Sequence, residues 1–148
     1  MSSWLGALIF FGVAVGCSTK APECDLSAEL HARAGSAVTE CGHAVLGSDA
    51  KPVDDCVVSS FNTNSAFVAE YDRHGTDSKV VFGLAGDGIG NVTFLLWDAD
   101  PSGGSGAHSV ITADSCTDPA VDASPSRDPF VTPPLNCTSM TSLGRVCD

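Results

Sequence analysis

The stretch that decides the fold is AFVAEYDRHGTDSKVVFGLAGDGIGNVTFLLWD, residues 66–98. Apolar and polar side chains alternate along Ala66–Asp72, Lys79–Ala85 and Val92–Asp98, which is typical of β-strands with one buried face. The two short connections between these segments are rich in glycine, aspartate and asparagine, which favour tight turns. Because a parallel crossover needs a dozen or more residues, the short connections predict antiparallel strands.

Two further segments extend this pattern on either side. Ser109–Ala113 is a shorter strand candidate that follows a turn rich in proline and glycine. Pro52–Phe61 carries apolar residues at helical spacing, and a proline suits the first turn of a helix. The sequence therefore predicts an α+β fold, in which one short helix packs on a four-stranded antiparallel meander.

The two ends of the chain carry weaker signals. Repeated prolines interrupt 117–148, so we expect an irregular, Pro-rich C-terminal wrap there. The segment 18–36 is polar and rich in alanine. Leu26 and Leu30 could start a short helix, but a tether is the favoured interpretation. The domain proper is then expected at 38–148, as a single small disulfide-rich unit.

The N-terminal segment has the length of a signal peptide. Its apolar run, Trp4–Gly16, would span only about 20 Å as a helix, and a bilayer core is about 30 Å thick. The run therefore suits the apolar region of a cleaved signal. Small residues at Ala14 and Gly16 fit cleavage before Cys17. An ordinary cleaved signal and an uncleaved anchor stay open as alternatives.

The segment Ala14-Val15-Gly16-Cys17 resembles the lipobox of bacterial lipoproteins. This resemblance implies a signal peptide at 1–16, a lipid on the Cys17 thiol, and a lipidated N-terminus with its tether at 17–37. Where such proteins come from Gram-negative cells, a serine after the cysteine, here Ser18, implies sorting to the outer membrane. Several acyl chains are ample for stable anchoring.

The cysteine count agrees with an exported protein. Without Cys17, six of the seven cysteines remain, and exported chains of this size use even sets as disulfides. Six cysteines allow 15 pairings, and the sequence does not choose among them. The favoured arrangement has two short local loops and a third bridge between the termini. The cysteines are too widely separated for a structural metal site. The favoured pairs are Cys41–Cys56, Cys116–Cys137 and Cys24–Cys147.

The charge of the chain excludes several classes of partner. It has 7 Lys and Arg against 18 Asp and Glu, a net charge of −11. With no basic cluster, nucleic-acid binding and polybasic docking on anionic lipid are not expected. A basic protein partner is a possible counterpart of this acidity.

Two glycine- and acid-rich turns are the candidates for chemistry. Asp98, Asp100 and Ser102 place oxygens at alternating positions, like the start of a calcium loop, but the twelfth position holds Ser109 instead of glutamate. They are therefore weak calcium candidates. Gly86–Gly90 leads into a strand instead of a helix, which indicates a hairpin turn and no phosphate cradle. No nucleophile-elbow pattern occurs, so neither an enzyme nor a cofactor is predicted.

Several scattered features resemble small cysteine-rich lipoproteins of myxobacteria, whose functions are mostly unknown. The resemblance runs over Cys41-Gly42, Cys56, Phe67, Gly75–Ser78 and Asp98–Gly104. It supports the same location and implies no activity. The favoured interpretation is an envelope lipoprotein at the outer membrane, facing the periplasm or the cell surface, with a non-enzymatic structural or binding role. Alternatives are a secreted or tethered binding module, such as a protease inhibitor or adhesin, and a calcium-dependent module.

Overall fold

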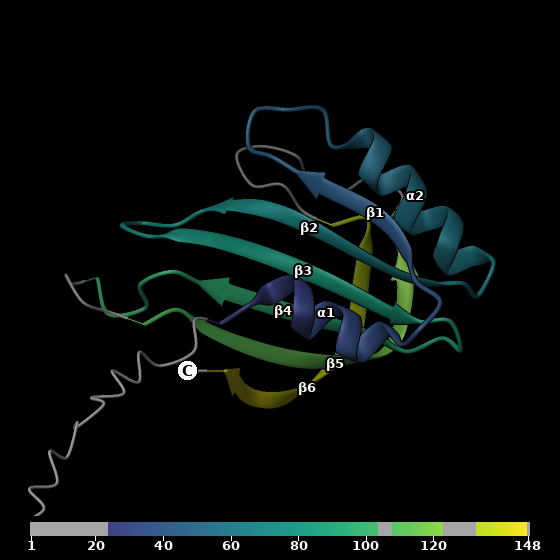
Figure 1. Ribbon diagram of the computed structural model, residues 1–148. Coiled ribbons are helices and arrows are strands. Elements are labelled where there is room, and N and C mark those ends of the chain that lie inside the picture. The colour runs from purple at the N-terminus through teal and green to yellow at the C-terminus, as the bar shows by residue number, and fades with distance from the viewer. Residues whose placement is uncertain (1–23, 104–107, 123–132, 148) are drawn as a thin grey trace, which may run out of the picture.

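The structure, a computed structural model, describes residues 24–103, 108–122 and 133–147. The expected signal peptide and Cys17 lie outside these residues. Two helices and a six-stranded mixed sheet form a disulfide-braced α+β fold (Figure 1). The elements are α1 (Leu26–Ala34), β1 (Thr39–Ala44), α2 (Lys51–Asn62), β2 (Ala66–His74), β3 (Lys79–Asp87), β4 (Val92–Asp98), β5 (Val110–Val121) and β6 (Leu135–Cys147).

The strands lie in the sheet in the order in which they occur in the chain, β1 to β6. Each neighbouring pair from β2 to β6 is antiparallel, so the predicted meander is confirmed. The predicted number of four strands is wrong, because β1 and β6 are added at the two edges. β1 is parallel to β2, and α2 is the crossover between them. The predicted helix over Pro52–Phe61 is confirmed as α2.

The expected irregular C-terminal wrap is wrong over the described residues. β5 continues past Ala113 to Val121, and β6 pairs with it along most of its length. Pro119 is tolerated within β5 because the pairing of β4 with β5 ends at Cys116. Beyond that point no strand among the described residues pairs with this side of β5, and proline within sheets is found at such edges.

The expected tether is also wrong from Cys24 onward, because the described residues there include the helix α1. Leu26, Leu30 and Ala34 repeat at four-residue spacing and are buried on one side of α1. Asp25 caps the helix, since its Oδ1 accepts a hydrogen bond from the backbone N–H of Ala28 at 3.1 Å. The segment gave only a weak signal because a nine-residue helix takes most of its stability from packing.

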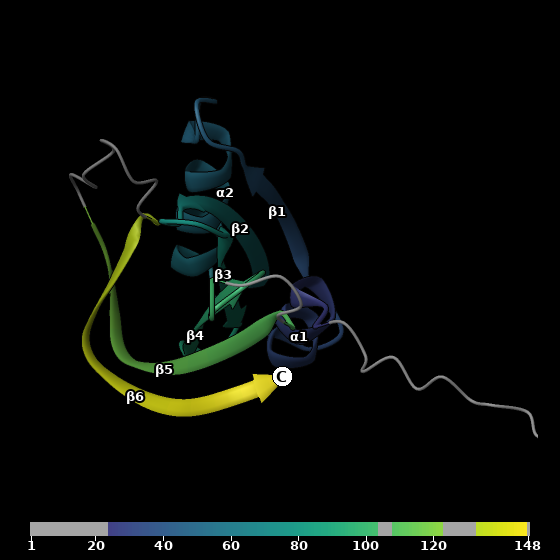
Figure 2. The same ribbon diagram turned by 90° about the vertical axis from the view of Figure 1, so that its left-hand side faces the viewer.

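The two helices cover opposite faces of the sheet, which therefore lies between them. Phe67, Ala69 and Tyr71 of β2 join the core under α2, whereas Val68 joins the core under α1. Successive side chains of a strand point to opposite faces, so the same strand serves both cores. Figure 2 shows β5 and β6 bending in a long arc, and β6 ends beside α1.

Three disulfides hold these layers together, and they are the three favoured pairs. Cys24–Cys147 joins the start of α1 to the end of β6. Cys41–Cys56 joins β1 to α2. Cys116–Cys137 joins β5 to β6. Neither helix in the described part of the chain has the length and apolar character needed to cross a membrane.

Candidate functional site

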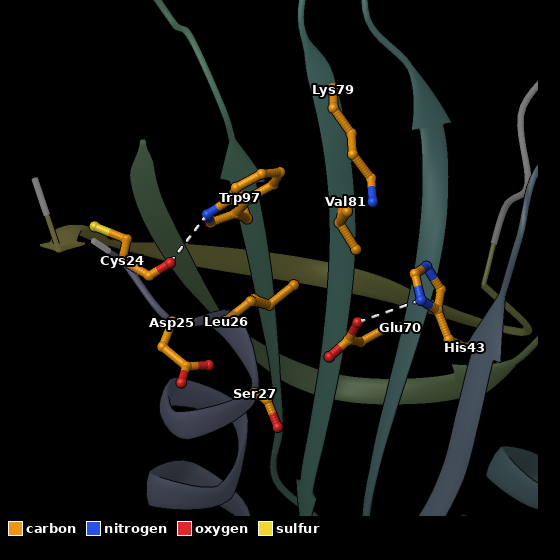
Figure 3. Close-up of a pocket in the computed structure, with 9 residues that line it drawn as sticks. All are labelled: Cys24, Asp25, Leu26, Ser27, His43, Glu70, Lys79, Val81 and Trp97. Carbon is orange, nitrogen blue, oxygen red and sulfur yellow. Dashed lines mark hydrogen bonds and ion pairs between the residues drawn. The ribbon is translucent and has the colours of Figure 1, made fainter. Parts of the chain in front are cut away.

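A shallow groove of about 440 Å³ lies at the N-terminal end of α1 (Figure 3). It exists because α1 covers only part of its face of the sheet. Leu26 and Leu30 lie over Gly83, whereas the sheet toward Lys79 extends beyond the start of the helix. The lining side chains come from α1 and the residues just before it, and from β1 to β4: Cys24, Asp25, Leu26, Ser27, His43, Glu70, Lys79, Val81 and Trp97.

The pairing of the strands determines which residues form the floor of this groove. Val81 of β3 lies opposite Asp72 of β2 on one side and opposite Trp97 of β4 on the other. Glu70 is two residues before Asp72, and β1 brings His43 opposite Glu70. Because residues two apart on a strand share a face, the carboxylates, the imidazole and the indole gather on the side of the sheet that α1 leaves open.

His43 is the centre of a charged network at one end of the groove. Its Nε2 lies 2.8 Å from Asp72 Oδ1, and its Nδ1 lies 3.6 Å from Glu70 Oε2. Lys79 approaches the same Asp72 oxygen more loosely, with Nζ at 4.0 Å. The His43 side chain is 35% exposed, so these pairs are partly shielded from water. The network links the edge strand β1 to β2 and β3.

Trp97 forms the opposite end of the groove and is held in place. Its indole Nε1 donates a hydrogen bond to the backbone carbonyl of Cys24 at 3.2 Å. Cys24 is itself fixed by its disulfide to Cys147 and is buried. A half-buried ring with its only donor satisfied presents an ordered apolar surface. The groove thus combines a fixed aromatic wall with a partly exposed carboxylate cluster.

A second, smaller depression of about 180 Å³ continues the groove along α1. It shares Ser27, His43 and Glu70 with the groove and extends to Glu40. Glu40 Oε1 lies 2.5 Å from His31 Nε2, while His31 Nδ1 donates to the backbone carbonyl of Ser27 at 2.7 Å. The Ser27 carbonyl first, and Glu40 second, raise the pKa of His31 above its usual value.

The predicted calcium candidates lie elsewhere and have other partners. Asp98 Oδ1 accepts hydrogen bonds from Ser78 Oγ at 2.6 Å and from the backbone N–H of Asp100 at 3.0 Å. Ser102 Oγ donates to Asp100 Oδ1 at 3.2 Å. These contacts are those of a polar turn. Over 24–103, 108–122 and 133–147, no group of three or more His, Cys, Asp or Glu residues is placed to hold a metal ion.

The glycine-rich segment after β3 forms a hairpin turn, as predicted. The Asp87 carboxylate accepts hydrogen bonds from the backbone N–H groups of Ile89 and Asn91 and from the Asn91 side chain. Partial burial opposes ionisation, but these hydrogen bonds outweigh it and lower the pKa of Asp87 below its usual value. The turn closes the hairpin between β3 and β4.

The residues of the groove were not predicted as a site. Trp97 lies in the predicted strand Val92–Asp98, but the strand pattern did not show that α1 stops short of this residue. His43 lies in β1, whose sequence TECGHA has no alternation and whose register is interrupted after Glu40. In the comparisons with known proteins, no family model, curated protein or solved structure matches the chain.

Proposed function

We propose that this chain is an exported, lipid-anchored envelope lipoprotein with a non-enzymatic binding role, and that the groove at the start of α1 is its binding surface. The observation that carries the export is the cysteine pairing. Six cysteines form three disulfides, which persist in oxidising compartments and are rare in the cytosol. Only Cys17 is left over, and it stands where a lipid would be attached.

The geometry of His43 supports a binding role over catalysis. A histidine that acts as a general base needs one ring nitrogen directed at the group from which it takes a proton. Both nitrogens of His43 face carboxylates, Asp72 and Glu70. The network therefore resembles an electrostatic clamp between strands more than a catalytic dyad.

The position of the groove supports a surface close to the membrane. Cys24 lines the groove and is seven residues after Cys17. An extended chain of that length reaches at most about 25 Å. A lipid on Cys17 would thus hold the groove near the bilayer, at the outer membrane in the proposed location.

Metabolic labelling tests the anchor. Cells that express the full chain are grown with [³H]-palmitate, and the label on the protein is compared between the wild type and the Cys17→Ala variant. We expect the wild type to be labelled. The variant should carry no label and should no longer be found in the membrane fraction. A variant that keeps the label would refute the lipoprotein proposal. The Cys137→Ala variant is the matched control, because its cysteine is disulfide-bonded and its label should persist.

A further inference from the structure

We infer that the groove binds the side chain of a lysine residue within an extended segment of a protein partner. This inference rests on the proposed binding role of the groove and adds the chemistry of the ligand. It requires three properties of the groove: a surplus of negative charge, an apolar surface for the aliphatic stem, and a shape that continues along α1.

The surplus of negative charge is spread along the groove. Glu70 lines its charged end and Asp72 pairs with His43 there, whereas Asp25 lies beside Cys24 at the Trp97 end. The Lys79 ammonium group and the His43 imidazole stand against these three carboxylates. The Lys79 side chain is 61% exposed and its contact with Asp72 is long, so it can turn toward water when another cation enters. A bound ammonium group would then lie between carboxylates that are partly shielded from solvent.

The apolar surface suits a lysine stem. Leu26 and Val81 line the floor, and the fixed indole of Trp97 forms the wall. Lysine buries its methylene groups along apolar surface while its ammonium group stays at a polar site. A tryptophan ring also attracts an ammonium group that comes within about 6 Å of its face. In Figure 3 the Lys79 side chain extends along β3 beside Val81, with Trp97 on one side and His43 on the other.

The shape favours an extended segment over a compact ligand. Compact ligands are enclosed by their pockets, whereas this groove is shallow and runs on into the second depression through Ser27 and Glu70. The second depression adds the Glu40 carboxylate at its far side. The net charge of −11 also steers a basic partner toward the protein. The residues that flank the bound lysine can therefore lie in the second depression, alongside α1.

Tryptophan fluorescence provides a direct test. Trp4 and Trp97 are the two tryptophans, so the full chain with Trp4→Phe reports on Trp97 alone. The probe is the peptide acetyl-Ala-Gly-Lys-Gly-Ala-amide, titrated at low ionic strength. We expect a saturable change in Trp97 emission. The same peptide with Nε-acetyl-lysine, which lacks the charge, should bind at least about tenfold more weakly.

Two charge variants separate the groove from the acidity of the whole protein. Glu70→Gln removes a carboxylate from the groove and should weaken the lysine peptide about tenfold. Asp55→Asn removes the same charge from an exposed site on α2, where Asp55 pairs with Lys51, and should leave the affinity unchanged. Far-UV circular dichroism and thermal melts show whether both variants keep the fold of the parent.

Three results would overturn the inference: no saturable signal, equal binding of the acetylated peptide, or equal loss of affinity in the two variants. The last result would mean that only the overall charge attracts the peptide. These outcomes are independent of palmitate labelling. Loss of the anchor proposal therefore leaves the ligand inference standing, and a failed titration leaves the anchor proposal standing.

Discussion

The two faces of the sheet are covered by helices of unequal length, and the difference between them creates the candidate site. α2 has twelve residues and packs through Val53 and Val57 on the side chains of Phe67 and Tyr71. Tyr71 also donates a buried hydrogen bond to Asp54 of α2 at 3.1 Å. α1 has nine residues. The part of the sheet that it covers ends at Leu26, and the groove lies beyond that residue. Because α1 is shorter than α2, it buries less of the sheet and leaves the candidate binding surface exposed.

The largest expected effect comes from removing the disulfide that holds the α1 face. The double variant Cys24→Ala with Cys147→Ala opens a bridge of sequence separation 123 and should lower the free energy of unfolding by about 5 kcal/mol. Cys41→Ala with Cys56→Ala opens a bridge of separation 15 on the α2 side and should cost about 3 kcal/mol. Urea denaturation monitored by circular dichroism measures both. A larger loss of unfolding free energy in the Cys41/Cys56 variant than in the Cys24/Cys147 variant would contradict this ranking.

The next effect tests how strongly α1 depends on packing. Leu30 is 1% exposed at the centre of α1, and Leu30→Ala should destabilise the protein by about 3 kcal/mol. The control is Leu143→Ala in β6, where the side chain is 51% exposed and the expected change is below about 0.5 kcal/mol. Thermal melts give the ranking. Similar melting temperatures for the two variants would show that α1 contributes little to the fold.

Two glycines of β3 compare the closeness of packing on the two faces. A Cβ added at Gly86 would lie 2.2 Å from the ring of Phe67, on the α2 face. A Cβ at Gly83 would lie 2.9 Å from Leu30 Cδ2, on the α1 face. A flexible leucine end can move more easily than a buried ring, so we expect about 3 kcal/mol of destabilisation for Gly86→Ala and about 1 kcal/mol for Gly83→Ala. Denaturant midpoints of the two variants check the order.

The smallest effect is a pH dependence at the edge of the α1 face. The pKa of His31 is raised above 6.5 in the folded protein by the Ser27 carbonyl and by Glu40. The protonated form is therefore favoured by folding, and its contribution is fully present below about pH 6.5 and lost as the pH rises through the folded value. His31→Gln should reduce stability at pH 5 and change it little at pH 8. An equal effect of His31→Gln at both pH values would contradict this assignment.

The local patterns of the chain predicted its central elements. Alternation over 66–98 predicted β2, β3 and β4 as strands. The expected single buried face is wrong, because each of these strands contributes side chains to both cores. The spacing of apolar residues predicted α2. The three favoured disulfides are present, and two of the pairs close short loops. The polar turns at Asp87 and Asp98 were predicted as turns because their hydrogen bonds are made within a few residues.

Long-range contacts decided the remaining structure. β6 lacks a buried face along most of its length and becomes a strand because β5 offers it a backbone edge. α1 needs the uncovered face of the sheet and the bridge to Cys147 to form. The candidate groove depends on where α1 begins relative to Trp97 and on the parallel pairing that brings His43 beside Glu70. The sequence by itself determined the central strands, because these depend on neighbouring residues. Only the tertiary structure could assemble the groove, because its residues come from five elements whose separations in the chain carry no periodic signal.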